Sequence, residues 1–162
     1  GAKEGSLTIM AGGDEEAFKA SLQVLNLYSK YSKRMGDSGT GQLTKMVNQI
    51  CIAGLIQALA EGMHFSEKAG LNTQEVIEVI SRGAAQSWQM DNRWESMLAD
   101  YYEHGFAVDW MRKDLGFVLE ESEVNGSNLE ITNLIDSFYA EVQQKEGGRW
   151  DTSSLFRRLN SQ

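Results

Sequence analysis

The sequence has no proline, one cysteine and two histidines among its 162 residues. The lack of proline suits a chain that is mostly uninterrupted helix, because proline removes a backbone donor and breaks helices. The single cysteine, Cys51, cannot form an internal disulfide, and we expect it to be an inert core thiol in a reducing compartment. That compartment would be the cytoplasm, or the mitochondrial matrix if the protein is eukaryotic.

Positive charge is also scarce. The chain has 15 Lys and Arg against 23 Asp and Glu, a formal net charge of −8. This balance argues against nucleic acid or an anionic membrane surface as a partner. No apolar run reaches membrane-spanning length without polar breaks, and no signal peptide opens the chain. The composition, with 41% hydrophobic and 23% charged residues, is that of a globular domain able to bury a core.

Motifs for metal binding and for nucleophilic catalysis are missing as well. Glu61 and His64 match half of a di-iron helical-bundle motif, but the second Glu-x-x-His is absent. Neither Gly-x-Ser-x-Gly nor a Cys/His zinc spacing occurs. Gly39 and Gly41 open a helix but lack the third glycine of a dinucleotide fingerprint. We therefore expect no metal site and no complete phosphate-binding fingerprint.

A long apolar segment organises what is present. After Gly41, helix-compatible residues continue to Ala69 and are apolar almost all round, which is typical of a helix buried in a larger assembly. Further helices are predicted at 72–83, 86–102, 109–124, 131–145 and 151–159. Ahead of the long helix, 7–11 and 31–35 are predicted strands on either side of a helix that begins at Asp14.

Lys45, Asn48 and Gln49 project from one face of the long helix, because they are three and four residues apart. A lysine on a helix normally extends its ammonium into water. Here the positive end of the helix dipole and the apolar neighbours Met46 and Val47 would both favour the neutral amine. Such an amine can act as a general acid or base, so Lys45 is the candidate catalytic residue. A solvated surface lysine is the alternative.

Three ordered stretches resemble the β-hydroxyacid dehydrogenases. Residues 36–49 resemble the Gly-x-Gly-x-x-x-Lys-x-x-Asn-(Asn/Gln) signature of this family. Residues 5–13 resemble the strand that closes its cofactor domain, and Phe106 followed by Lys113 and Asp114 resembles a later helix. The family includes 3-hydroxyisobutyrate dehydrogenase, tartronate semialdehyde reductase and, more distantly, 6-phosphogluconate dehydrogenase. The similarity covers essentially the whole chain.

The resemblance implies a mainly α fold, a helical bundle around one long apolar helix like the C-terminal domain of 6-phosphogluconate dehydrogenase. Residues 1–36 would be the C-terminal remnant of a Rossmann cofactor domain, and 37–162 a helical substrate and dimerisation domain. The chain opens on glycine, and the Ser-Gly-Gly substrate loop of the family would lie upstream. We therefore expect a piece of a longer protein, inactive alone, with no tightly bound cofactor. Dimerisation of relatives through this domain implies a homodimer.

The resemblance also implies roles for individual residues. Lys45 would exchange a proton with the oxygen of the substrate while hydride passes to or from the nicotinamide of NAD or NADP. Lys113 would approach that cofactor. Four residues would line the substrate pocket: Asn48, Gln49, Phe106 and Asp114. The reaction would interconvert a small 3-hydroxy acid and its semialdehyde or keto form, and relatives with Asn or Gln at position 49 leave the acid open. The alternative is a non-catalytic helical dimerisation or interaction module.

Overall fold

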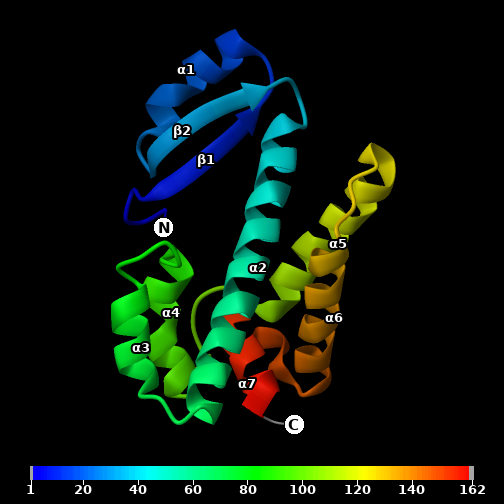
Figure 1. The fold of residues 1–162 in the computed structure, drawn as a ribbon. Helices are drawn as coiled ribbons and strands as arrows, with labels where there is room; N and C mark the ends of the chain where they lie inside the picture. The colour runs from blue at the N-terminus through cyan, green and yellow to red at the C-terminus, as the bar shows by residue number, and fades with distance from the viewer. Residues whose placement is uncertain (1, 161–162) are drawn as a thin grey trace. The chain divides into compact units, whose positions relative to one another are not determined.

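The computed structural model describes residues 2–160 and divides into two compact units, the first ending at Asn48 and the second beginning at Gln49. The described residues are mainly α, as predicted, with two strands and seven α-helices (Figure 1). The elements are β1 (Leu7–Gly12), α1 (Glu15–Leu25), β2 (Ser29–Gly36), α2 (Thr40–Lys68), α3 (Thr73–Ile80), α4 (Trp88–Leu98), α5 (Val108–Asn125), α6 (Glu130–Gln144) and α7 (Leu155–Asn160). Two short 3-10 turns, η1 (Gly147–Arg149) and η2 (Thr152–Ser154), precede α7.

The N-terminal unit is a strand, a helix and a strand followed by the first turns of α2. β1 and β2 pair in parallel, from Leu7 opposite Ser29 to Gly12 opposite Gly36. Asp14 caps α1 by accepting a hydrogen bond of 2.8 Å from the backbone N–H of Ala17. The predicted strand–helix–strand order is therefore confirmed. No side chain of β1, α1 or β2 is buried, so these elements form no hydrophobic core of their own.

Two glycines let the start of α2 lie directly against the end of β1. A Cβ on Gly41 would lie 2.5 Å from the carbonyl oxygen of Met10, and a Cβ on Gly12 would lie 2.6 Å from that of Asp37. Real Cβ atoms do not approach backbone oxygens so closely. Glycine at position 41, the second glycine of the signature, thus has a steric reason: only a residue without a side chain permits this backbone contact.

The C-terminal unit is built around the rest of α2. Ala53, Ile56, Ala60 and Met63 are fully buried and recur at helical spacing on one side of this helix. Each of the other helices adds buried side chains to the same core: Ile77 of α3, Met97 of α4, Leu115 of α5, Tyr139 of α6 and Phe156 of α7. In Figure 1, α3 and α4 form one pair of this unit, while α5 and α6 form another with α7 near their base.

On the opposite side of α2, the described residues leave several side chains exposed. Phe65 is 71% exposed and Leu55 is 44% exposed. Cys51 is exposed too, so the prediction of a core thiol is wrong. The physical reason is its position on the helix, since residue 51 points away from the side that carries Ala53 and Ile56. A segment that is apolar all round does not tell which side faces the core.

The length and composition of α2 also meet the criterion for a membrane-spanning helix. The most apolar 18-residue stretch of α2 has a mean hydropathy of 1.3, and a third of that stretch is buried. This is weak evidence for a span, because the core helix of a folded domain passes the same test.

Helix ends differ from the sequence prediction where capping intervenes. α4 begins after Ser87, whose Oγ accepts from the N–H of Met90 at 3.1 Å, and ends before Asp100, which has a positive φ of 50°. The helix predicted at 86–102 is therefore shorter than expected. α6 ends at Gln144 and is followed by Glu146 in the left-handed region, with Gly147 inside a 3-10 turn rather than at a simple stop.

Candidate active site

Gln49 of α2 and Asp114 of α5 meet in the C-terminal unit. The Nε2 of Gln49 donates a hydrogen bond of 2.8 Å to Oδ2 of Asp114 and lies 3.9 Å from the sulfur of Met111. The side chain of Gln49 is only 2% exposed. Buried amides need hydrogen-bond partners, so this bond fixes the orientation of both side chains. It also joins two of the sequence motifs, which lie 65 residues apart.

The second oxygen of Asp114 pairs with the neighbouring lysine. Nζ of Lys113 lies 3.0 Å from Oδ1 of Asp114. The carboxylate is largely covered, at 18% side-chain exposure, whereas the lysine side chain is 61% exposed. Asp114 is therefore held between a buried amide and a solvated ammonium, and Lys113 keeps donors available for another group. Three of the predicted site residues, Gln49, Lys113 and Asp114, are thus brought together.

Phe106 lies just before α5 and packs against the core of the C-terminal unit. Its ring centroid is 5.7 Å from that of Trp110, in a tilted arrangement. Its backbone N–H donates a hydrogen bond of 2.8 Å to Oδ2 of Asp151. Its carbonyl oxygen accepts a hydrogen bond of 3.0 Å from the backbone N–H of Thr152. The ring and hydrogen-bond contacts described for Phe106 are thus with Trp110, Asp151 and Thr152, rather than with Asp114.

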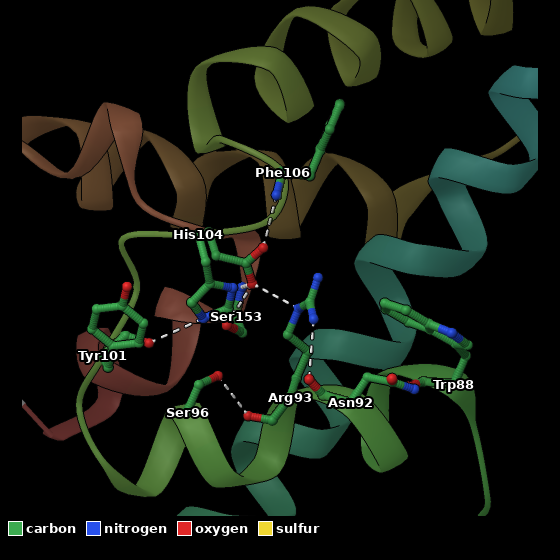
Figure 2. Close-up of polar contacts among 9 residues, drawn as sticks. Trp88, Asn92, Arg93, Ser96, Tyr101, His104, Phe106 and Ser153 are labelled. Atoms are coloured by element: carbon green, nitrogen blue, oxygen red, sulfur yellow. Dashed lines mark hydrogen bonds and ion pairs between the residues drawn. The ribbon is translucent and has the colours of Figure 1, made fainter. Parts of the chain in front are cut away.

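Asp151 anchors the loop that carries Phe106. Its carboxylate is fully buried and also accepts hydrogen bonds from the backbone N–H and the Oγ of Ser153, at 3.1 and 2.6 Å. Arg93 of α4 completes the cluster, with Nε 3.1 Å from Oδ1. Figure 2 shows Arg93, Phe106 and Ser153 approaching this centre from three segments of the chain. A side chain on Gly105 would collide with the carboxylate, so glycine is required there.

The sequence does not reveal this anchor. Asp151 opens the helix predicted at 151–159, and its carboxylate accepts from the backbone N–H of Ser153, as a capping residue does. The bond to Phe106 spans 45 residues, and no local pattern indicates it. The only available signal was an acidic residue between Trp150 and three consecutive Ser and Thr residues, which is also an ordinary turn composition.

Lys45 and Asn48 lie in the N-terminal unit, on the first turns of α2. Lys45 is exposed and Asn48 is half-buried. Val47 is itself 59% exposed, so the described residues do not bury Lys45 in the way that was expected of its apolar neighbours. The helical repeat places Lys45, Asn48 and Gln49 on one side of α2, as predicted from their spacing.

The N-terminal unit contributes an exposed amine and a side-chain amide, and the C-terminal unit contributes a second amide, a fixed carboxylate and an exposed ammonium. An amine can exchange a proton, and amides, carboxylates and ammonium groups can bind small polar molecules as donors or acceptors. Within residues 2–160, no group of three or more His, Cys, Asp or Glu side chains is arranged to hold a metal ion.

Residues 39–159 match the family model described as NAD-binding of NADP-dependent 3-hydroxyisobutyrate dehydrogenase. An uncharacterized oxidoreductase of Shewanella frigidimarina is 57% identical over 98% of this chain, which covers 55% of that relative. The 2-hydroxy-3-oxopropionate reductase of Escherichia coli is 31% identical over 98% of this chain and 54% of its own length.

Among solved structures, the 3-hydroxyisobutyrate dehydrogenase of Mycobacterium tuberculosis, described with L-serine, superposes with a TM-score of 0.89 at 25% identity. That similarity covers 98% of this chain and 56% of the other. The chain therefore spans about half the length of the relatives that it matches.

Proposed function

This chain belongs to the 3-hydroxyisobutyrate dehydrogenase family of NAD(P)-dependent hydroxyacid dehydrogenases, and on that premise we propose that it is the helical catalytic part of such an enzyme. The whole enzyme would interconvert a small 3-hydroxy acid and its semialdehyde or keto form. The observation that carries the proposal is the buried bond between Gln49 and Asp114. It joins two signature stretches that would otherwise be separate surface motifs.

Lys45 is proposed as the proton-transfer residue. Its amine would accept the proton of the substrate hydroxyl during oxidation and return it to the carbonyl oxygen during reduction. The exposure of Lys45 leaves the amine accessible to a ligand. Asn48 and Gln49, on the same side of α2, would position the polar groups of the substrate. Asp114 would hold Gln49 in place through their hydrogen bond, and Phe106 would supply an apolar wall.

A nicotinamide dinucleotide, NAD or NADP, would supply the hydride chemistry. Lys113 fits a contact with such a cofactor, because its ammonium is mostly exposed and is held in place by a single described carboxylate. The Gly-x-Gly-x-x-Gly fingerprint that cradles pyrophosphate is not in this sequence. We therefore propose that the 162-residue chain alone does not turn over hydroxy acids and does not bind the cofactor tightly.

The decisive experiment uses the longer enzyme that contains this chain. Lys45→Ala should lower kcat by about 10²–10⁴-fold while the protein stays folded, because general acid–base catalysis contributes about that much. Lys45→Arg should not restore kcat, because guanidinium does not lose its proton near neutral pH. Lys113→Ala should mainly raise the KM for the cofactor.

Lys68→Ala is the matched control, because Lys68 is an exposed lysine at the other end of α2. It should leave both kcat and KM unchanged. Near-parental kcat in Lys45→Arg would exclude proton transfer by Lys45 and leave it, at most, a fixed positive charge. Full activity in all three variants would favour the alternative, a helical interaction module without a catalytic role.

We also propose that this chain forms a homodimer, with small hydroxy acids rather than nucleic acid or membrane as its other partners. Support comes from apolar side chains exposed in the C-terminal unit, including Phe65 of α2 and Val124 and Ile131 near the turn between α5 and α6. Light scattering at micromolar concentration should give the dimer mass, and a monomer mass would contradict it. A cytoplasmic or mitochondrial-matrix location stays a prediction.

A further inference from the structure

A second group of charged residues surrounds a cavity of about 250 Å³ in the C-terminal unit. It lies between the end of α6, the turn that follows it and α7. Its walls are formed by six residues: Val142, Lys145, Trp150, Ser154, Arg157 and Arg158. None of these belongs to the candidate active site. The volume is several times the roughly 30 Å³ that one water molecule occupies in the liquid.

Ser154 lines this cavity and has an unsatisfied hydroxyl. The residue is fully buried, and its Oγ makes no hydrogen bond within the described part of the chain. Its backbone N–H is satisfied by the carbonyl of Asp151 at 2.9 Å. The preceding Ser153, by contrast, donates its hydroxyl to the Asp151 carboxylate. Buried hydroxyls are almost always paired, so Ser154 indicates a partner that the described residues do not supply.

Arg158 is a rigid cation on the wall of the cavity. It is 8% exposed, and its Nε and Nη2 lie 2.8 and 3.1 Å from the two carboxylate oxygens of Glu141. Its guanidinium carbon is 3.8 Å from the centroid of Phe138. The hydrogen bond from Arg158 lowers the pKa of Glu141, so this pair stays ionised near neutral pH. A guanidinium locked in this way still has its remaining nitrogen, Nη1, to offer to another acceptor.

Two more cations complete the walls. Arg157 lies 4.5 Å over the ring of Trp150, and its Nε is 3.5 Å from Oδ1 of Asp100. Lys145 also lines the cavity and is an exposed residue. The carboxylates of Glu141 and Asp100 pair with two of these three cations. The cavity lining therefore carries excess positive charge. None of the described residues that line the cavity is acidic.

We propose that this cavity binds a small oxyanion, of which a phosphate group fits best. Ser154 would donate its hydroxyl proton to one oxygen, while Arg158 and Lys145 would meet the others. A phosphate group suits this arrangement because its several oxygens can accept from donors that converge from different directions. The proposal is independent of the oxidoreductase assignment, since it needs no residue of the candidate active site.

The test is a titration of the 162-residue chain with inorganic phosphate at constant ionic strength, followed by calorimetry and by Tm. We expect saturable binding and a Tm that rises with phosphate concentration, while chloride at equal ionic strength has no such effect. Glycerol phosphate provides the second arm: tighter binding than inorganic phosphate would identify a phosphate monoester as the ligand, and weaker binding would identify the free ion.

Ser154→Ala is the informative variant. It should weaken phosphate binding about tenfold, as expected for loss of one hydrogen bond to a charged group. It should not lower the Tm of the ligand-free chain, because the hydroxyl has no described partner to lose. Lys145→Ala, at an exposed position, should also weaken binding without loss of folding. Ser137→Ala, an exposed serine of α6 outside the cavity, is the matched control and should bind like the parent.

Three results would overturn the proposal. The first is the absence of saturable phosphate binding by the parent chain. The second is equal affinity in the parent and in Ser154→Ala. The third is a ligand-free Tm that falls in Ser154→Ala, because it would show that the hydroxyl already has a partner within the protein.

Discussion

The N-terminal unit buries no side chain of β1, α1 or β2, whereas the C-terminal unit completely encloses Met63, Leu115 and Tyr139. The first unit is held by a parallel ladder and by backbone contact at Gly12 and Gly41. The second is held by apolar burial, the larger stabilising term in most domains. We therefore expect the two units to respond differently to the same kind of substitution.

The largest expected change in stability comes from replacing the capping aspartate Asp151, which we compare with the capping aspartate Asp14. Asp151→Ala removes a fully buried carboxylate and leaves Arg93 without its partner, which should cost about 3–5 kcal/mol in the free energy of unfolding. Asp14→Ala removes an exposed cap of α1 and should cost about 1 kcal/mol, confined to that helix. Chemical denaturation, with hydrogen exchange read segment by segment, measures both.

Equal losses in the free energy of unfolding in these two variants would contradict the expectation that the two units respond differently. So would rapid exchange throughout the C-terminal core in Asp14→Ala, because that helix belongs to the other unit.

The next effect concerns glycines. Gly41→Ala forces a methyl group against the backbone of β1 and should destabilise the N-terminal unit by about 1–3 kcal/mol. Gly54→Ala is the control on the same helix, where an added Cβ meets nothing within 4 Å. It should stabilise α2 by about 0.5–1 kcal/mol, because alanine loses less backbone entropy in a helix. The same sign in both variants would show that the close contact at Gly41 is relieved at little cost.

Alkaline pH probes the C-terminal unit. Burial is the main cause that raises the pKa of Tyr139 above its ordinary value of 10. In the unfolded chain the Tyr139 hydroxyl loses its proton near pH 10, whereas in the folded chain it keeps the proton to higher pH. The stability due to the neutral hydroxyl is therefore complete below pH 10 and is lost as the pH rises further, by about 1.4 kcal/mol per pH unit. Tyr139→Phe should make this dependence shallower without removing it, because burial also raises the pKa of Tyr102. An unchanged slope would contradict the role of Tyr139.

The smallest effect is expected at acidic pH. The hydrogen bond from Arg158 lowers the pKa of Glu141 from its ordinary value of 4.5. Its contribution is present above that value and is lost as the pH falls through the lowered pKa of the folded state. Glu141 is 44% exposed, so solvent screening keeps the change small. Comparing Glu141→Gln with the parent chain between pH 3 and pH 7 would isolate it.

Local patterns predicted much of the fold. Helix-compatible residues without proline after Gly41 indicated a single helix to the neighbourhood of Lys68, and α3 lies within the helix predicted at 72–83. The helical periodicity of apolar residues could not identify the buried side of α2, because apolar residues occur on all of its sides. The prediction that Cys51 is a core thiol was wrong for this reason. Helix propensity alone also overestimated the length of α4, whose ends are set by Ser87 and Asp100.

The candidate site was predictable only in part. The motifs that contain Gln49 and Asp114 were recognised separately, and the structure joins these two side chains by a hydrogen bond. The hydrogen bond from Phe106 to Asp151 depends on the tertiary packing of segments far apart in the chain. No rule of residue spacing predicts such a contact. The roles of all six predicted site residues stay predictions: Lys45, Asn48, Gln49, Phe106, Lys113 and Asp114.

The parallel pairing of β1 and β2 has a consequence for the handling of this chain. In a sheet of two strands, each strand has one edge with unpaired backbone N–H and C=O groups, which can recruit a strand from another molecule. β2 carries three positive charges, Lys30, Lys33 and Arg34, that discourage such addition, whereas β1 carries no charge. At high protein concentration the edge of β1 is therefore the place where strand-by-strand aggregation would begin, and a lysine introduced there is the simplest way to keep the chain in solution.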